Sequence, residues 1–563
     1  MRRSSVVLAM MVAWPLMGQA QDVHYMENLY RFIENTDVFE LNQEEGHAYF
    51  VPEQHLSLNG DWKFKFTDVP EKMPKDFYEV GYDDRAWADI AVPSNWEMQG
   101  FGDAMFRNVS LSFQADPPNV PRDYNPTGAY RRRFTVPSDW QGQKIFLRLE
   151  KTASASFVWI NGQEVGYNEG AHEPAEYDIT SYVKPGENVI AVHVVKFSDG
   201  YYLEGQDYWR LAGIFDDVWI YAVPKFRLFD WAVVTDLDET FTDADLKVQV
   251  EVRNASEQVQ SGSTVKAVLV DASDQEVATF ESVAFDVAAQ GKAEVSLSTR
   301  VSNPAKWTAE TPTLYRLKLA LQGRDGSVLN EAAVVIGFKE TQIKGDVFYL
   351  NGVPIKVNAM NSHMQHPDLG HAMDEATIRR DIEILKQFNF NAVRTSHYPP
   401  TNLYLQFANE YGLYVIDEAG TEAHATEFLS DRPEFREMYK DRVRKMVLRD
   451  RNHPSVLFWS AGNESGNGVN IGEVIKEGKR LDPTRFWMYG GNSFSHPAED
   501  IIGPRYASPE DLEREIGKYE RNEDVIRPSF MDEYLSVAGN GGGGMDEYWD
   551  VIDRYPRIMG GAL

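Results

Sequence analysis

The chain has 563 residues, a formal net charge of −30 and no cysteine. At roughly 150 residues per domain, this length predicts three or four domains, each large enough to bury a core. The negative charge argues against nucleic-acid binding, which depends on Lys and Arg side chains that release counterions from phosphates. The lack of cysteine excludes disulfides, thiolate nucleophiles and cysteine-ligated zinc or iron–sulfur sites.

The N-terminus has the pattern of a secretory signal peptide over residues 1–20. Arg2 and Arg3 precede the apolar run Val6–Met17, and Gly18-Gln19-Ala20 offers small residues for cleavage. This run is too short to span a bilayer, and no later stretch approaches the roughly eighteen apolar residues that a spanning helix needs. We therefore expect an exported protein, periplasmic or secreted, without a membrane span.

Residues 21–224 read as many short strands separated by turns. The pairs Asn59-Gly60 and Asn161-Gly162 suit type I′ hairpins, in which both central residues take positive φ. Strands such as Asn188–Val194 alternate in the way expected of a sheet with one buried face. The pattern predicts a β-sandwich of the jelly-roll type.

Residues 225–337 continue the all-β pattern with a different spacing. Leu246–Val252 alternates strictly between apolar and polar residues, and so does Leu317–Leu321. A segment of this length and pattern predicts an immunoglobulin-like β-sandwich.

From residue 338 onward strands alternate with helices, which predicts a (β/α)₈ barrel. One helix is expected over Asp374–Phe388, with the apolar residues Ile378, Ile382, Leu385 and Phe388 on one face. Met559–Leu563 begins an eighth strand, so we expect an incomplete barrel whose C-terminal part is missing and whose strand edges are unpaired. The other predicted strands are Lys356–Asn361, Ala392–His397, Tyr414–Ala419, Val456–Ser460, Phe486–Gly490, Ile501–Tyr506 and Ser529–Glu533.

Polar residues gather where these strands end, and a barrel of this type carries its active site at that face. Two glutamates, Glu464 and Glu533, follow the fourth and seventh strands. Paired carboxylates suit glycoside hydrolysis, in which one acts as acid and the other as nucleophile. The remaining strand-end residues include His363, Arg394, His397, Asp417, Glu418, Glu422, His424, Asn463, Tyr506 and Asp532.

Long motifs in the chain resemble glycoside hydrolase family 2. Asp450–Glu464 resembles the acid/base signature of that family, and Asn391–Pro399 resembles its other signature. Asn463–Gly468 is similar to the bacterial β-galactosidases, whereas the glucuronidase branch usually has proline after the glutamate. The resemblance extends to the first sandwich through Asn125–Gly128 and Gln206–Phe215.

The resemblance implies a retaining exo-β-galactosidase that hydrolyses terminal non-reducing β-D-galactosides of oligo- or polysaccharides. Glu464 would be the general acid/base and Glu533 the nucleophile, with their carboxyl groups about 5 Å apart. Arg394 and Tyr506 would keep Glu533 ionised, while a less solvated Glu464 keeps its proton.

The resemblance also implies sugar and metal ligands. Glu422, His424 and Glu464 match a magnesium site, although carboxylates with one imidazole suit Mn²⁺ equally. Asp207 matches a sodium ligand in addition to its expected sugar contact. Relatives are often oligomers, so an oligomer of a longer protein is left open. The residues expected to contact sugar are Asn125, Asp207, His363, Arg394, His397, Asn463 and Tyr506.

Two alternatives to this function stay open. One is a non-catalytic carbohydrate-binding protein or inactive fragment, and the other, within the enzyme class, is a β-glucuronidase. The galactosidase pattern has a histidine three residues after the nucleophile, where this chain has Ser536. The smaller side chain leaves room for a sugar substituted at its 6-position.

Overall fold

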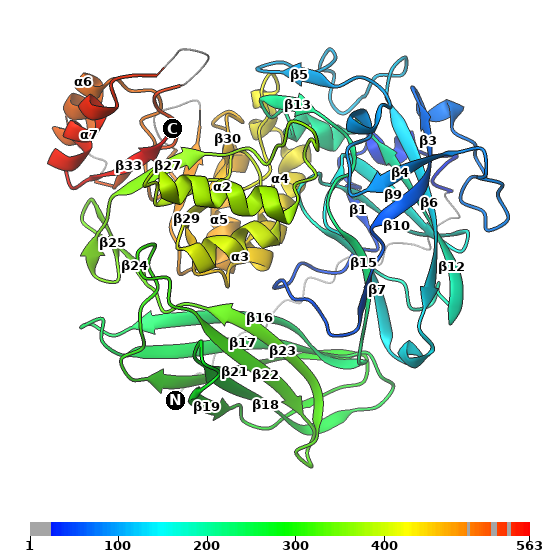
Figure 1. Cartoon of the computed structure of the whole chain (residues 1–563), viewed down its shortest axis with the longest axis horizontal. Coiled ribbons are helices and arrows are strands. Elements are labelled where there is room, and N and C mark those ends of the chain that lie inside the picture. The colour runs from blue at the N-terminus through cyan, green and yellow to red at the C-terminus, as the bar shows by residue number, and fades with distance from the viewer. Residues whose placement is uncertain (1–23, 492–495, 520–525, 537–541) are drawn as a thin grey trace, which may run out of the picture.

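The computed structural model describes residues 24–491, 496–519, 526–536 and 542–563. The predicted signal peptide lies outside these described residues. Two β-sandwiches and a strand–helix barrel follow one another along the chain (Figure 1). A short helix, α1 (Tyr30–Ile33), packs on the first sandwich. None of the helices in the described ranges is long and apolar enough to cross a membrane.

The first sandwich has a seven-stranded and a four-stranded antiparallel sheet. Asn161 and Gly162 both take positive φ between β9 and β10, which confirms the predicted hairpin. The hairpin predicted at Asn59-Gly60 is wrong, because β2 and β3 pair with strands of different sheets. In sheet order the strands are β1 (Glu40–Leu41), β10 (Gln163–Glu169), β9 (Ala155–Ile160), β12 (Gly186–Val195), β6 (Thr127–Val136), β3 (Gly60–Thr67) and β4 (Ala88–Val92), then β11 (Ala175–Asp178), β7 (Lys144–Leu149), β15 (Val218–Val223) and β2 (His55–Ser57).

The second sandwich packs a three-stranded sheet on a larger antiparallel one, as its alternating sequence predicts. Leu246, Val248, Val250 and Val252 of β17 are all buried, while the residues between them face outward or sit half-buried. The strands are β16 (Phe226–Leu237), β17 (Ala244–Asn254) and β21 (Gly291–Val301), then β19 (Glu276–Glu281), β18 (Gln260–Val270), β22 (Tyr315–Gln322) and β23 (Val328–Ile336).

The barrel strands pair in parallel around a ring. The eighth strand expected to begin at Met559–Leu563 is β33, which pairs with β27 on one side and β32 on the other, and β31 and β32 are the two ends of this seven-stranded sheet. In ring order the strands are β31 (Trp487–Gly490), β30 (Val456–Asn463), β29 (Tyr414–Glu418), β28 (Ala392–Arg394), β27 (Val357–Asn361), β33 (Ile558–Ala562) and β32 (Ser529–Met531).

The strand predicted over Ile501–Tyr506 does not form, yet this segment closes the ring. The N–H of Asp500 donates to the carbonyl of Trp487 at 2.8 Å, and the N–H of Ile502 donates to that of Pro528 at 3.0 Å. Ile502 in turn accepts from the N–H of Phe530 at 2.9 Å. Residues 500–502 therefore bridge β31 and β32 with too few paired residues to make a strand.

Helices pack outside the ring (Figure 1). The helix α2 (Glu375–Gln387) begins after Asp374, whose carboxylate accepts from the N–H of Thr377 at 2.8 Å as an N-cap. Its predicted apolar face is buried except for Phe388, which is 71% exposed because the helix has already ended. The other longer helices are α3 (Asn402–Tyr411), α4 (Arg436–Asp450), α5 (Val469–Leu481) and α7 (Met545–Arg554).

A segment of the first sandwich lies against the mouth of the barrel. The N–H of Glu422 donates to the carbonyl of Leu203 at 2.9 Å, and Arg442 of α4 forms an ion pair with Glu204 at 2.7 Å. Both partners of that ion pair are buried. This junction fixes the chain just before Asp207 beside the ends of the barrel strands.

Candidate active site

Glu533 lies just beyond the end of β32, among cationic side chains. Its Oε1 is 3.2 Å from Nη1 of Arg394 and 3.7 Å from Nε2 of His397, and Arg505 also contacts it. Tyr506 donates its hydroxyl to the other carboxylate oxygen. Burial acts to raise the pKa of Glu533, but Arg394, Arg505 and His397 together hold it far below its usual range. Glu533 is therefore an ionised carboxylate, as a nucleophile requires.

A buried carboxylate, Glu418 at the end of β29, orients two of these cations. Its Oε2 accepts from Nε of Arg394 at 2.7 Å and from the hydroxyl of Ser460 at 2.6 Å. Its Oε1 lies 2.7 Å from Nδ1 of His397. Burial acts to raise the pKa of Glu418, yet Arg394 and His397 lower it, so the carboxylate stays charged. The sequence placed Glu418 at a strand end but assigned it no role.

Glu464 lies across the site, directly after β30. It takes a left-handed φ of 33°, and its N–H donates to the carbonyl of Gly490 at 2.8 Å. Its side chain is 21% exposed against 15% for Glu533, so the expectation of a less solvated Glu464 is wrong. The two carboxylates differ in their neighbours, since Arg394, Arg505 and His397 contact Glu533 whereas His424 contacts Glu464.

Asn463 connects the groups around both carboxylates. Its amide nitrogen donates to Glu422 at 2.8 Å, and its amide oxygen accepts from Nη2 of Arg394 and Nη1 of Arg505, each at 2.9 Å. These bonds fix which end of the amide faces each neighbour. Asn463 is held rigidly beside Glu464.

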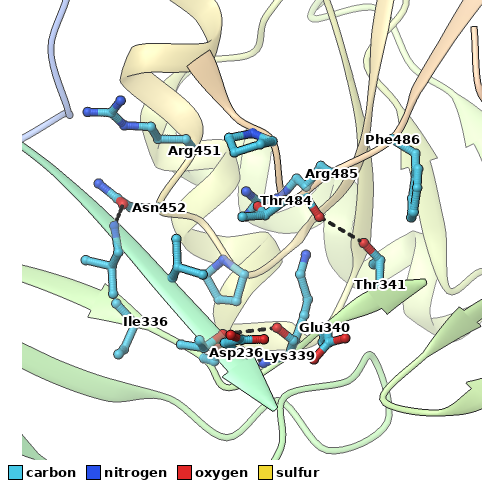
Figure 2. Close-up of a pocket in the computed structure, with 16 residues that line it drawn as sticks. Asp236, Ile336, Lys339, Glu340, Thr341, Arg451, Asn452, Thr484, Arg485 and Phe486 are labelled. Carbon is cyan, nitrogen blue, oxygen red and sulfur yellow. Dashed lines mark hydrogen bonds between the residues drawn. The ribbon is translucent and has the colours of Figure 1, made fainter. Parts of the chain in front are cut away.

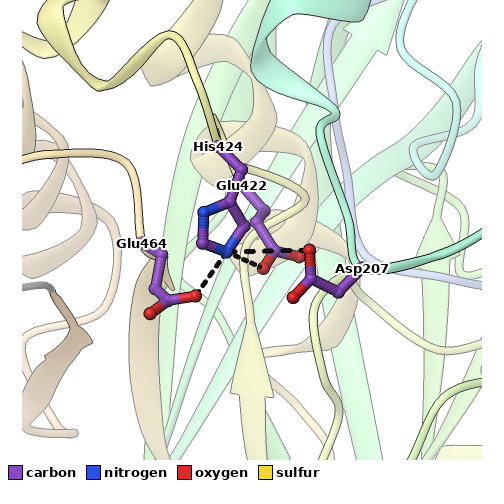
Figure 3. Close-up of side chains that lie close together, drawn as sticks. All are labelled: Asp207, Glu422, His424 and Glu464. Carbon is purple, nitrogen blue, oxygen red and sulfur yellow. Dashed lines mark ion pairs between the residues drawn. The ribbon is translucent and has the colours of Figure 1, made fainter. Parts of the chain in front are cut away.

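Four side chains with metal-ligating atoms meet beside Glu464, as Figure 3 shows: Asp207, Glu422, His424 and Glu464, whose ligating atoms all lie within 4.8 Å of one another. His424 Nε2 is 3.3 Å from Glu422 and 3.7 Å from Asp207, and it also contacts Glu464. The three residues of the predicted metal site are thus brought together, with Asp207 added from the first sandwich.

The chemistry of this group fits a divalent cation. Glu422 Oε2 and Asp207 Oδ1 are buried without a hydrogen-bond partner, so each offers an unused lone pair. Burial acts to lower the pKa of His424, but Glu422 and Glu464 raise it to about 10. The positive charge of a protonated His424 therefore offsets the negative charges of the carboxylates around it. A divalent cation bound by the oxygen ligands would supply positive charge in the same place.

The remaining predicted sugar ligands have different surroundings. His363 lies 3.4 Å from the hydroxyl of Tyr398, and burial, with His397 nearby, lowers its pKa to about 4, so its ring is neutral. Asn125 has no exposed surface, and its amide bonds the backbone of Phe197 through both polar atoms at 2.9 Å. A sugar contact by Asn125 would require those bonds to open.

Arg505 is the site residue that the sequence analysis missed. Its guanidinium touches Glu533, lies 3.8 Å from Glu464 and donates to Asn463. In the predicted strand Arg505 and Tyr506 would point to opposite faces. The strand does not form and Tyr506 takes a φ of 53°, so both side chains reach Glu533. The sequence offered one signal for Arg505, namely its position directly before the predicted site residue Tyr506.

We predict that Arg505→Gln shifts the acidic limb of activity to higher pH. Removing one cation lets the lowered pKa of Glu533 rise toward its usual range, so the carboxylate protonates at a higher pH. The pH dependence of kcat/KM measures this pKa in the free enzyme. Arg514→Gln, at a half-exposed arginine paired with Asp511, is the matched control. An acidic limb that stays in place would contradict the role of Arg505.

A cavity of about 270 Å³ lies elsewhere, between the second sandwich and the barrel (Figure 2). Its lining includes Lys339, Asn452 and Arg485, and Thr341 donates to the carbonyl of Thr484 at 3.4 Å across it. Asn452 precedes β30 and Arg485 precedes β31. The cavity is therefore at the opposite end of the barrel from the two carboxylates.

The sequence matches three domain descriptions of a single family. Residues 56–224 match the sugar-binding domain of the family 2 glycosyl hydrolases, residues 226–339 match the family's middle domain, and residues 341–563 match its TIM-barrel domain.

Curated proteins similar to the chain are named β-galactosidase. The one from Priestia megaterium is 36% identical over 94% of this chain and 54% of its own length. The one from Photobacterium profundum is 38% identical over 91% of this chain and 50% of its own. The chain therefore spans about half the length of the curated relatives it matches.

Solved structures share the fold. A family 2 glycosyl hydrolase from Bacteroides cellulosilyticus superposes with a TM-score of 0.74 at 25% identity, over 90% of this chain and 64% of that one. A Bifidobacterium dentium β-glucuronidase superposes with a TM-score of 0.75 at 20% identity, over 92% of each chain, which shows the fold alone. With three domains of one family in the expected order, this chain belongs to glycosyl hydrolase family 2.

Proposed function

We propose that the chain carries the catalytic site of a retaining exo-β-galactosidase that acts on terminal non-reducing β-D-galactosides. The observation that carries the proposal is the pairing of Glu533, ionised by Arg394 and Arg505, with Glu464 across the site. The preference for galactose is supported by the curated relatives, which are named β-galactosidase at 36% to 38% identity.

The geometry supports a double displacement. The carboxylate of Glu533 attacks the anomeric carbon while Glu464 donates a proton to the departing glycosidic oxygen. The carboxylate of Glu464 then takes a proton from water, which attacks the anomeric carbon and releases Glu533. Arg394, Arg505 and Tyr506 donate hydrogen bonds that keep Glu533 anionic before it attacks. The same bonds stabilise its carboxylate when it is released from the sugar.

We also propose that Asp207, Glu422, His424 and Glu464 hold Mg²⁺, with Mn²⁺ as the alternative, in place of a separate sodium ion at Asp207. The bound ion would supply positive charge beside Glu464. EDTA is then expected to lower the melting temperature and added Mg²⁺ to restore it, because a ligand that binds only the folded state stabilises it. Glu422→Gln should abolish this response. A melting temperature indifferent to EDTA and to Mg²⁺ in the unaltered chain would contradict the site.

A panel of nitrophenyl glycosides tests the sugar. We expect kcat/KM for the β-galactoside to exceed that for the β-glucuronide by at least about 100-fold, since a uronic carboxylate would enter a site that already holds Glu464, Glu533 and the acidic group Asp207 and Glu422. Preference for the glucuronide would establish the alternative enzyme, and binding without turnover would establish a carbohydrate-binding protein. Ser536 is exposed, so a 6-O-methyl galactoside in the panel tests tolerance at the 6-position.

A further inference from the structure

Asp532 is a second carboxylate beside Glu533, and it takes no part in the proposed double displacement. It directly follows β32 and is 1% exposed. Its Oδ2 lies 3.4 Å from Nη1 of Arg505, the guanidinium that also contacts Glu533. This oxygen has no hydrogen-bond partner in the described part of the chain, so its contact with Arg505 is an ion pair without a hydrogen bond.

Two glycines leave the space that this carboxylate fills. A Cβ atom on Gly503 would lie 2.9 Å from Oδ1 of Asp532, and one on Gly490, the last residue of β31, would lie 3.0 Å from Oδ2. The Cβ atom on Gly490 would also lie 2.6 Å from Nη2 of Arg394. These distances are shorter than the roughly 3.5 Å at which non-bonded atoms pack. The absence of side chains at both positions therefore lets the Asp532 carboxylate lie among the cations of the site.

The backbone of Asp532 contacts the second arginine of the site. Its carbonyl accepts from Nη1 of Arg394 at 3.4 Å and from Nδ2 of Asn361 at 2.9 Å. The same Nη1 of Arg394 donates to Glu533 at 3.2 Å. Both arginines that hold Glu533 are thus in contact with Asp532, one through the carboxylate and one through the carbonyl.

The charge of Asp532 affects how strongly the arginines stabilise Glu533. Burial raises the pKa of Asp532 to about 6, although Arg505 and Arg394 act to lower it, so the group is ionised above pH 7. An arginine that is partly neutralised by Asp532 stabilises the anion of Glu533 less. A nucleophile gives up its negative charge as it bonds the anomeric carbon, so excess stabilisation of the free anion would slow that step.

We propose that Asp532 is a positioning residue that acts through Arg505, because it shares this cation with Glu533 and so keeps Glu533 reactive as a nucleophile. When Glu533 becomes the ester of the glycosyl-enzyme, it no longer offers a negative charge to Arg505. Asp532 then keeps the guanidinium in place until the carboxylate is released. This inference rests on the proposed function, since only a double displacement changes the charge of Glu533 in this way.

A slow substrate, 2-deoxy-2-fluoro-β-galactosyl fluoride, separates the two half-reactions. Glu533 displaces fluoride ion from the anomeric carbon, which inactivates the chain, and water later cleaves the ester, which restores activity. Asp532→Asn should slow inactivation about tenfold, because Arg505 then holds the anion of Glu533 more tightly. Reactivation, in which Glu533 regains its charge, should be as fast as in the unaltered chain or faster. Asp546→Asn, at an exposed aspartate on α7, is the matched control and should change neither rate.

Arg505→Gln tests whether the arginine transmits the effect. In that background, adding Asp532→Asn should slow inactivation by no more than about threefold. A tenfold loss that persists there, an equal slowing of inactivation and reactivation, or two unchanged rates would overturn the role of Asp532. If Asp532→Asn does not fold, Asp532→Ser is measured in the same way, because its neutral side chain is smaller than the carboxylate. An unaltered chain that the reagent never inactivates would contradict the proposed function itself, and the role of Asp532 with it.

Discussion

Glu533→Gln is expected to reduce the turnover of aryl β-galactosides by about 10⁴-fold or more. A neutral amide cannot form the glycosyl-enzyme, and the substitution also leaves Arg394 and Arg505 without the anion that they contact. The initial rate of nitrophenol release measures the effect. Glu547→Gln, an exposed glutamate on α7, is the control and should retain full activity.

A rescue experiment separates a nucleophile from a residue that merely supports the fold. In Glu533→Ala the space vacated by the carboxylate admits azide, which should attack the anomeric carbon directly and give the α-galactosyl azide. Turnover above a few per cent in Glu533→Gln, or a rescue product of β configuration, would contradict the nucleophilic role.

Glu464→Ala should have an effect that depends on the leaving group. A poor leaving group needs the proton of Glu464, so its cleavage should fall by about 10²–10⁴-fold. A dinitrophenolate leaves without protonation, so formation of the glycosyl-enzyme from its galactoside should remain fast and its hydrolysis should become slow. Azide should then accelerate turnover and give the β-galactosyl azide.

The proximity of Glu464 to His424 and Glu422 requires a control for loss of the metal. Glu422→Gln removes one of the same proposed ligands and leaves the acid in place. It should therefore lower all rates by a similar factor, without dependence on the leaving group. Equal losses for good and poor leaving groups in Glu464→Ala would show that Glu464 acts only through the metal site.

Much of the fold follows from local patterns in the sequence. Leu246–Val252 alternates between apolar and polar residues, and its apolar residues Leu246, Val248, Val250 and Val252 are all buried. Asp374 before an apolar face with helical spacing predicts α2 within one residue at each end. These features depend on neighbours in the chain, so local periodicity and capping suffice to predict them.

Features set by distant neighbours were predicted less well. The ring closes through backbone hydrogen bonds from Asp500 to Trp487 and between Ile502 and the chain at Pro528 and Phe530. Because so few residues are paired, the sequence of this segment has no alternating pattern that would reveal it. Phe388 continues the helical spacing beyond the end of the helix, so its exposure has no local signal.

Within the candidate site, strand-end positions predicted Glu464, Glu533, Arg394 and His397. The place of Arg505 depends on an irregular turn at Tyr506 rather than on alternation. Asn125 was assigned by resemblance, and only the structure shows that the backbone of Phe197 occupies its amide.

As the proposed nucleophile, Glu533 would form a covalent bond to galactose during each turnover. The most direct measurement is mass spectrometry of the chain after exposure to 2-deoxy-2-fluoro-β-galactosyl fluoride, whose fluorine slows breakdown of the glycosyl-enzyme. We expect one fluorogalactosyl group per chain, on the peptide that contains Glu533. An adduct on a different residue would rule out Glu533 as the nucleophile, and so would rapid hydrolysis of β-galactosyl fluoride by a chain that forms no adduct.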